Sequence, residues 1–569
     1  LVFVGARDLV DFTCETSLES LLSVEPAEYA GPVSVSRERY MGETAVRFTV
    51  TLQKELVSGT SLNFAFGSDD PAVFVAQRYA QTLPVRMLVT AGDKQICETG
   101  QDVTVEVLPA EFDRWNIVGP SLVSGSADSK ISVVPLDAFG NRTESVSQPE
   151  ISLENRTGKT TLQSGLKPDE TGSAPCTLDA DGVYEIVVVG PAETRSIGGP
   201  IVRDRAFADD RLYWGDIHCK TRFSDGAKSV DECFEFARDV ACLDFAAVTD
   251  HEAPAGYLSD EQWERTIDAV NRFNTTHEFA TLLGYEWSGE GEDWFQGHLC
   301  VYFRDDTGTL YRTSTPEFCT AAQLMGTVSS RDIIVVPHHP AGPARTHTSE
   351  WPVIYNDIEP VAEIFSRWGA YEFHRDALSR KGGRSKAYIR NALRRGHHLG
   401  FIAGSNSHYG MPGVSVEETP RDKYIDPRPG LTAVYANDLS RGAIFDAIRN
   451  RRCYATTGAR IVADYSVNGV KAGGTIELER DNPRHIQIEA HGTAPIERVD
   501  IIRCGESTIS FDYSSPDVTM EWTDDISLPT ILMMRPGGYY LFGFYYVRIV
   551  QADGHVAWLS PVHIACAAE

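Results

Sequence analysis

The chain has 569 residues, which corresponds to about three to four domains of ordinary size. Hydrophobic residues make up 42% of it and charged residues 23%, which fits a globular protein and neither a disordered chain nor an integral membrane protein. Asp and Glu outnumber Lys and Arg by 80 to 52, for a formal net charge of -28. Because this charge repels phosphate groups, we expect no nucleic-acid partner and no binding to anionic membranes.

Two features bear on the cellular compartment. The sequence contains no apolar run of about 18 residues and no basic segment ahead of an apolar stretch, so we expect neither a membrane span nor a signal peptide. The 11 cysteines are odd in number and form no C-x-x-C pair, which is typical of reduced intracellular proteins. These features predict a cytoplasmic protein.

Both ends of the chain have the pattern of β modules. Strand-length segments that alternate or run apolar occur at 45–52, 102–108, 131–136 and 183–189. They predict a β-rich module over 1–108 and an immunoglobulin-like β-sandwich over 109–205. The pattern returns after residue 462, with Asp553-Gly554 as a hairpin turn, and predicts a third β-sandwich over 461–569.

The central region, 207–460, alternates between apolar strands and amphipathic helices. The expected strands are 212–217, 243–248, 279–283, 333–336, 361–365, 401–403 and 431–435. The expected helices are 229–242, 260–273, 385–395 and 440–451, the last with Ser440 as N-cap. About seven such βα units predict an α/β barrel of parallel strands.

Histidine is concentrated in this central region. The first 217 residues contain none, whereas 11 of the 15 lie between His218 and His408. Polar side chains also follow the ends of the expected strands: His218, Asp250, His251, Glu286, His338, His339, Glu363 and His408. In a parallel barrel these ends form the active-site face, so the side chains are expected to converge. A mixture of imidazole and carboxylate ligands favours Zn, Mn or Fe over Ca or Mg.

Three motifs carry a resemblance to a known family. Tyr213-Trp-Gly-Asp-Ile-His218, Ser224-Asp225-Gly226 and Ala247-Val-Thr-Asp-His251 resemble the opening of the PHP superfamily, the polymerase and histidinol phosphatase phosphoesterases. Later stretches, among them 284–287, 363–366, 430–434 and 454–458, are similar to a long, uncharacterised PHP-like branch catalogued as a domain of unknown function. The resemblance covers roughly residues 207–569. It implies a distorted (βα)7 barrel that holds divalent metals at its mouth, flanked here by β-sandwich modules.

The resemblance also implies metal ligands, residue by residue. One metal would take Asp225, His251 and His408, and a second would share Glu286 and add His298 and His339. His339 is preferred to its neighbour because the family's ligand directly precedes proline, here Pro340. The full predicted metal-binding set is His218, Asp225, Asp250, His251, Glu286, His298, His338, His339 and His408.

The chain departs from the family pattern at two positions, and both affect the same third metal. Lys220 stands at the second histidine of the family's H-x-H, and Asn406 stands where an Asp would precede the last ligand. A protonated lysine has no lone pair, so that site is expected to be empty or weak, which leaves one or two ions. Lys220 either holds Glu286 or a substrate oxyanion as a point charge, or acts as a base if neighbouring metals depress its pKa.

Four residues are predicted to take part in catalysis: Lys220, Glu286, His347 and Arg367. His347, or the neighbour of His339, is the candidate acid for the leaving group. Arg345, His347, Arg367 and Glu372 lie in or after loops where substrate contacts are common, but ordinary surface salt bridges explain them equally well.

The predicted function is that of a metal-dependent hydrolase, a phosphoesterase that acts on a small anionic ester through a metal-activated water. One alternative is cleavage of another bond, such as a sulfate ester or an amide, and another is a non-catalytic binding protein with a decayed metal site. No G-x-S-x-G, G-x-x-x-x-G-K-[ST] or strand-following G-x-G-x-x-G motif supports a serine hydrolase, a nucleotide triphosphatase or a dinucleotide enzyme. The sequence leaves the oligomeric state open.

Overall fold

The structure is a computed structural model of the whole chain. It describes residues 2–4, 22–25, 31–40, 43–53, 63–66, 80–91, 94–99, 104–123, 128–144, 148–157, 160–169, 172–178, 180–190, 195–203, 211–253, 258–289, 297–328, 332–342, 351, 353–379, 386–414, 428–480, 482–505, 507–534 and 541–566.

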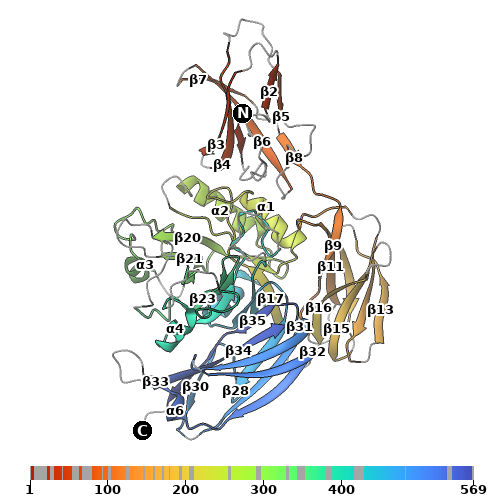
Figure 1. Ribbon diagram of the computed structural model, residues 1–569, viewed down its shortest axis with the longest axis vertical. Coiled ribbons are helices and arrows are strands. Elements are labelled where there is room, and N and C mark those ends of the chain that lie inside the picture. The colour runs from red at the N-terminus through yellow and green to blue at the C-terminus, as the bar shows by residue number, and fades with distance from the viewer. Residues whose placement is uncertain are drawn as a thin grey trace.

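The first module lies at one end of the long axis of the molecule (Figure 1). Its strands are β1 (Val2–Val4), β2 (Leu22–Glu25), β3 (Val33–Tyr40), β4 (Glu43–Val50), β5 (Asn63–Phe66), β6 (Gln81–Ala91), β7 (Lys94–Thr99) and β8 (Thr104–Val107). They form a sheet of order β3-β4-β1-β6-β7, with β8 paired to β6, and a separate β2-β5 pair. The described part of this module is therefore built of strands.

The second module consists of two facing sheets. Its strands are β9 (Phe112–Val118), β10 (Leu122–Val123), β11 (Asp128–Asp137), β12 (Glu150–Asn155), β13 (Thr160–Leu166), β14 (Ser173–Thr177), β15 (Gly182–Val189) and β16 (Arg195–Arg203). One sheet has the order β10-β16-β15-β12-β13 and the other β14-β11-β9. Apolar side chains of both sheets, such as Val133, Leu153 and Ile186, share one core, which is the arrangement of a sandwich.

Side-chain N-caps mark the start of most helices of the central region. They are α1 (Val230–Glu235), which continues as a π-helical turn over Phe236–Val240, α2 (Asp260–Phe273), α3 (Ala321–Thr327), α4 (Ile389–Arg394) and α5 (Arg441–Arg449). The Ser229 and Ser259 hydroxyls accept the backbone N–H of the third residue of α1 and α2, respectively. The side chain of that third residue in turn accepts the backbone N–H of the serine. Ser440 caps α5, as the sequence predicts. The helix α3 was not predicted.

The central strands form three sheets. They are β17 (Arg211–Asp216), β18 (Phe245–Ala246), β19 (Ala280–Thr281), β20 (Leu283–Gly289), β21 (Gly297–Phe303), β22 (Ile333–His338), β23 (Val361–Ser366), β24 (Gly369–Ala370), β25 (Gly400–Ala403), β26 (Leu431–Ala436) and β27 (Cys453–Thr456). Strands β17, β18 and β19 pair in parallel, as do β23 and β25. Strands β20, β21 and β22 pair antiparallel.

The predicted barrel is therefore confirmed only as a mixed α/β arrangement that is rich in strands. The ladders of the described residues form no closed barrel. One reason is β21, an unpredicted strand that lies antiparallel between β20 and β22. The other is β26, which runs antiparallel to β17 and leads into the C-terminal sheet. Isolated parallel bridges, Cys219 to Ser407 and His251 to Glu286, connect the sheets at their carboxyl ends.

The C-terminal strands continue the central sheet. They are β28 (Val462–Val467), β29 (Val470–Lys471), β30 (Thr475–Leu478), β31 (Arg484–Arg503), β32 (Ser507–Asp524), β33 (Met533–Met534), β34 (Leu541–Gln551), β35 (Val556–Leu559) and β36 (Val562–Cys566), with the short helix α6 (Leu528–Ile531). The Asp553-Gly554 turn joins β34 to its antiparallel partner β35, as predicted. One ladder runs from β19 through β17, β26, β27, β35 and β34 to β31, and so crosses the predicted boundary at residue 460. The domain boundaries remain predictions.

Among the described residues no helix is both long and apolar enough to cross a membrane. The cysteines whose side chains the structure describes are free thiols: Cys176, Cys219, Cys233, Cys242, Cys300, Cys319, Cys453 and Cys504.

Candidate metal centre

The strand β17 and the segment after β25 are fixed to each other by Asp216. Its buried carboxylate accepts the backbone N–H groups of His218 (3.1 Å), Ser405 (3.0 Å) and Gly413 (3.0 Å). Burial raises the pKa of Asp216 to about 6. These bonds hold the segment that carries His218 against the segment that carries His408. The local sequence pattern around Asp216 does not reveal this role, because Ser405 and Gly413 are nearly 200 residues away.

Asp250 supports the turn on which Asp225 is carried. It accepts the backbone N–H of Thr221 at 2.9 Å, the Thr221 hydroxyl at 2.6 Å and the Ser224 hydroxyl. Gly226 completes the turn, because a Cβ there would lie 2.3 Å from the carbonyl oxygen of Lys220. Asp250 was predicted as a metal ligand, but its carboxylate faces this turn.

Asp225, His251 and His408 come together as the sequence predicts. Asp225 Oδ2 lies 3.3 Å from His408 Nε2, and Asp225 Oδ1 lies 3.9 Å from His251 Nε2. The other nitrogen of the His408 ring donates to the carbonyl oxygen of Asn406 at 2.9 Å, which leaves Nε2 with its lone pair toward Asp225. Ligands bound tetrahedrally to zinc at about 2.0–2.2 Å lie about 3.4 Å apart, close to the observed separations.

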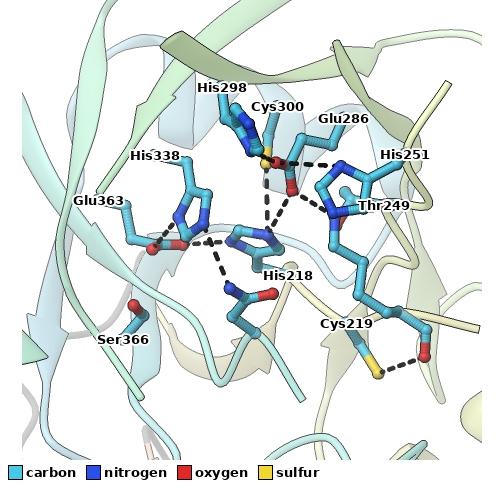
Figure 2. A network of polar contacts seen from close by, with 12 residues as sticks. His218, Cys219, Thr249, His251, Glu286, His298, Cys300, His338, Glu363 and Ser366 are labelled. Carbon is cyan, nitrogen blue, oxygen red and sulfur yellow. Dashed lines mark hydrogen bonds and ion pairs between the residues drawn. The ribbon is translucent and has the colours of Figure 1, made fainter. Parts of the chain in front are cut away.

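Glu286, His298 and His339 form a second group next to the first. Glu286 Oε1 contacts His298 Nδ1 and lies 3.4 Å from His251 Nδ1, as Figure 2 shows. The rings of His298 and His339 are 5.0 Å apart between centroids. His339 Nδ1 is buried and has no hydrogen-bond partner among the described residues. A buried nitrogen without a partner is costly, so this position suits a ligand that accepts its lone pair.

One carboxylate, that of Glu363 on β23, orients the rings of both His218 and His338. Nδ1 of His218 donates to Glu363 Oε2 at 2.6 Å, and Nδ1 of His338 donates to Glu363 Oε1 at 2.6 Å (Figure 2). Their Nε2 atoms face Glu286 Oε2 at 3.1 Å and Asn406 Nδ2 at 3.2 Å. Carboxylates commonly fix the orientation of metal-binding histidines in this way.

Electrostatics keep Glu286 ionised and three of the imidazoles neutral, whereas Cys300 and Glu363 raise the pKa of His218 against the effect of burial. Burial alone would raise the pKa of Glu286, but His251, Lys220 and His298 outweigh it and hold this pKa well below its usual range. Burial lowers the pKa of His251 to about 3, and it lowers the pKa values of His338 and His339 well below the ordinary value. Neutral imidazoles offer the lone pairs that a metal requires.

The contacts of Lys220 favour one of the two roles considered for it. Its side chain is 1% exposed, and its ammonium donates to Glu286 Oε2 and to the carbonyl oxygen of Thr249. Burial opposes the charge, but Glu286 outweighs burial and raises the pKa of Lys220. In the absence of metals these contacts keep the lysine protonated, which favours the point-charge role over that of a base.

Of the other predicted catalytic residues, Arg367 lies beside the first group. Its Nη1 is 3.5 Å from His408 Nδ1, and its guanidinium lies over the Tyr409 ring at 5.3 Å. Arg345 and His347 fall outside the described residues. Glu372 is buried and accepts bonds from Arg390, Tyr546, Trp558 and Arg548, so it belongs to a structural network.

Two contributors to the centre were not assigned a role from the sequence. Glu363 was noted only as a polar residue within an expected strand, and Cys300 was not singled out. Cys300 lies opposite Glu286 in the β20-β21 ladder, with its Sγ 3.8 Å from His218 Nε2. The alternation of β21 would have placed Cys300 on the same face as His298, had that strand been recognised.

The chain is similar to proteins that are described as uncharacterised. A family model described as "Protein of unknown function (DUF3604)" matches residues 241–324 and 416–471. An uncharacterised protein of Chlamydia pneumoniae is 27% identical over 542 residues, which cover 91% of this chain and 86% of the relative. Another, from Chlamydia trachomatis, is 24% identical over 539 residues, 91% of this chain and 85% of the relative.

One solved structure is similar in part. It is a two-domain protein from Bacteroides vulgatus containing a predicted PHP-like metal-dependent phosphoesterase. The match has 11% identity and a TM-score of 0.33, and it covers 62% of this chain and 96% of that one. So low a score does not decide the fold. What this chain does must therefore be argued from its own side chains.

Proposed function

We propose that this protein is a metal-dependent hydrolase that acts on small phosphate esters. The observation that carries the proposal is the convergence of two groups of lone-pair donors: Asp225, His251 and His408, and next to them Glu286, His298 and His339. The residues of both groups come from separate elements of the central region. An assembly of this kind is costly to bury unless a cation compensates it.

The donor set fits a divalent transition metal. It combines imidazole nitrogens with carboxylate oxygens, which suits Zn, Mn or Fe. The buried Nδ1 of His339, which has no partner among the described residues, supports the same conclusion. Asp225, His251 and His408 would hold one ion, and Glu286, His298 and His339 would hold a second.

A bound ion would lower the pKa of a water molecule toward neutrality and polarise an ester oxygen. Glu286, which is ionised and lies between the groups, balances positive charge. Arg367 is placed beside His408 and can donate to a substrate oxyanion, whereas the ammonium of Lys220 is already engaged with Glu286. The phosphate-ester class rests on the PHP-like motifs at 213–218 and 247–251, and an interpretation of the central strands as a distorted PHP-like barrel belongs to the same proposal.

The test combines metal analysis with a substrate panel. The purified full chain is analysed for bound metals and then assayed with aryl phosphate monoesters, phosphate diesters, aryl sulfates and anilides, with Mn or Zn added. We expect phosphate hydrolysis that a chelator abolishes and added metal restores. Asp225→Asn should lose about one equivalent of metal and on the order of 100-fold in rate. The control is Asp239→Asn, a substitution at an exposed position of the same region, which should change neither.

Other results would select a rival function. Hydrolysis of sulfates or anilides alone would keep the metal centre and reject the phosphoesterase. Much less than one equivalent of metal, together with no hydrolysis, would favour the binding protein with a decayed site.

A further inference from the structure

The two oxygens of Glu286 face different surroundings. Oε1 faces the histidines at 251 and 298, whereas Oε2 faces His218 at 3.1 Å (Figure 2). Oε2 also contacts the ammonium of Lys220. The carboxylate thus divides the centre into two halves. We call the side of Oε1, with Asp225, His251, His298, His339 and His408, the open half, and the side of Oε2, with His218, Lys220, His338 and Asn406, the closed half.

The closed half contains a set of side chains that could bind a cation. Ligand atoms of His218, Glu286 and Cys300 all lie within 4.8 Å of one another. The Nζ atom of Lys220 already contacts Glu286 Oε2, however, and the lysine is buried with no room to withdraw into solvent. An ammonium in that position supplies positive charge and repels a metal ion.

Asn406 supplies a second hydrogen-bond donor in the closed half, and it uses the lone pair of His338 Nε2. The amide of Asn406 donates through Nδ2 to His338 Nε2 at 3.2 Å, and the other nitrogen of that ring donates to Glu363 at 2.6 Å. Both nitrogens of His338 are therefore engaged. Replacing an amide by a carboxylate at 406 would remove this donor, because a carboxylate can only accept.

The open half has the opposite character. The Nδ1 atom of His339 has no hydrogen-bond partner among the described residues, and the lone pair of His408 Nε2 is directed toward Asp225 Oδ2 at 3.3 Å. His339 Nδ1 is therefore an acceptor to which none of the described residues donates. In the closed half, by contrast, the ammonium of Lys220 is in direct contact with the carboxylate of Glu286.

We infer that Lys220 and Asn406 make the closed half a metal-free site, in which the lysine ammonium permanently takes the place of a metal ion and holds Glu286 for the open half. The inference rests on the proposed function and deepens it, since it limits the centre to two ions and assigns Lys220 as a positioning residue. Lys220 does not touch the substrate.

The experiment counts metal ions in the full chain after saturation with zinc or manganese and removal of the excess. The wild type should hold at most two ions. Lys220→His replaces the ammonium with a ligand beside His218, Glu286 and Cys300, and should gain about one further equivalent. Lys220→Arg keeps the charge and should gain none.

Two further variants guard against a trivial result. Lys228→His alters another buried lysine, which lies over the Phe236 ring and not at Glu286, and it should leave the metal count unchanged. Asn406→Asp adds a carboxylate while Lys220 stays in place, and it should also gain no ion. If Lys220→His does not fold, the wild-type and Asn406→Asp counts decide the matter.

The possible failures are distinguishable. Three ions in the wild type, no gain in Lys220→His, or a gain in Asn406→Asp would each overturn this inference and leave the metal-dependent hydrolase intact. No metal in any variant would overturn both.

Discussion

At the scale of single residues, neighbouring carboxylates in this protein have separate tasks. Asp225 has a side chain that is 37% exposed and faces two histidines, whereas Asp250 is buried and accepts three hydrogen bonds from the turn over 221–224. The sequence predicts both as metal ligands, because a carboxylate near a histidine has the same local pattern in either role. The partners of the carboxylate distinguish the two roles, and they become visible only in three dimensions.

Substitution of Asp225 and of Asp250 should therefore change the stability of the metal-free protein by different amounts. We expect Asp250→Ala to lower the free energy of unfolding by about 3 kcal/mol, because it leaves buried donors of Thr221 and Ser224 without an acceptor. Asp225→Ala should change it by less than about 0.5 kcal/mol. Urea unfolding in the presence of a chelator measures both. Equal losses would contradict the assignment.

Glu359 is a buried acid that has no compensating charge among the residues that the structure describes. Burial raises the pKa of its side chain from 4.5 to about 8. Because the folded state holds this proton more tightly than the unfolded state, the wild type should lose stability as the pH rises from about 4.5 to about 8. Glu359→Gln does not titrate and should become the more stable protein over that range, by at most about 5 kcal/mol. Stability curves of the two proteins that stay parallel between pH 5 and 8 would reject this prediction.

At the scale of elements, the sequence predicts a helix well where the cap and the apolar spacing that define it lie within the segment itself. The helix expected over 260–273 is α2 to the residue, because its serine cap and apolar spacing lie within the segment itself. The direction of strand pairing is not encoded in this way. The run IIVVPH of β22 is apolar whether its neighbour is parallel or antiparallel, so a βα alternation suggested parallel strands where β21 makes an antiparallel sheet.

In the candidate site, too, contacts between distant segments are not encoded in the local sequence. That Asp225, His251 and His408 lie together was expected from the resemblance of the motifs to the PHP superfamily. The function of Glu363 could not be predicted, because its partners His218 and His338 are 145 and 25 residues away and reach it from other strands.

The contact between the loop after β24 and the C-terminal strands depends on Glu372. This carboxylate is buried between Arg390 and Arg548, which lower its pKa against the effect of burial. We expect Glu372→Gln to lower the free energy of unfolding by about 3–5 kcal/mol, because two arginines lose their buried counter-charge. The metal count should not change. Asp239→Asn, which removes an exposed partner of Arg238, is the control and should have little effect.

At the scale of the whole molecule, a charged cluster connects the second module to the C-terminal sheet. Asp517 accepts from Arg156 of the second module and from His491 of β31, each at 2.9 Å, and His491 also contacts Glu489 at 3.0 Å. These carboxylates raise the pKa of His491 although burial opposes them. The cluster is thus an ion network across a junction between modules.

This junction should depend on pH. A raised histidine pKa stabilises the folded state fully below the unfolded value of about 6.5, and the contribution disappears as the pH rises through the folded value. Wild type should therefore exceed His491→Gln in stability by about 1–2 kcal/mol near pH 5.5, and the difference should shrink toward pH 9. His485→Gln, on the exposed face of the same strand, is the control. A stability difference between wild type and His491→Gln that grows with pH would contradict the expected direction of this pH dependence.

The ladder that crosses residue 460 has a practical consequence for anyone who dissects this protein. Cleavage there would separate β27 from its partner β35 and leave a row of unsatisfied backbone groups on each fragment. Such edges recruit strands from other copies, so either fragment expressed alone should aggregate even if its own sequence is sound. Insolubility of a truncated form would then report a severed sheet and not a faulty module, and shorter versions for crystallisation should be cut elsewhere.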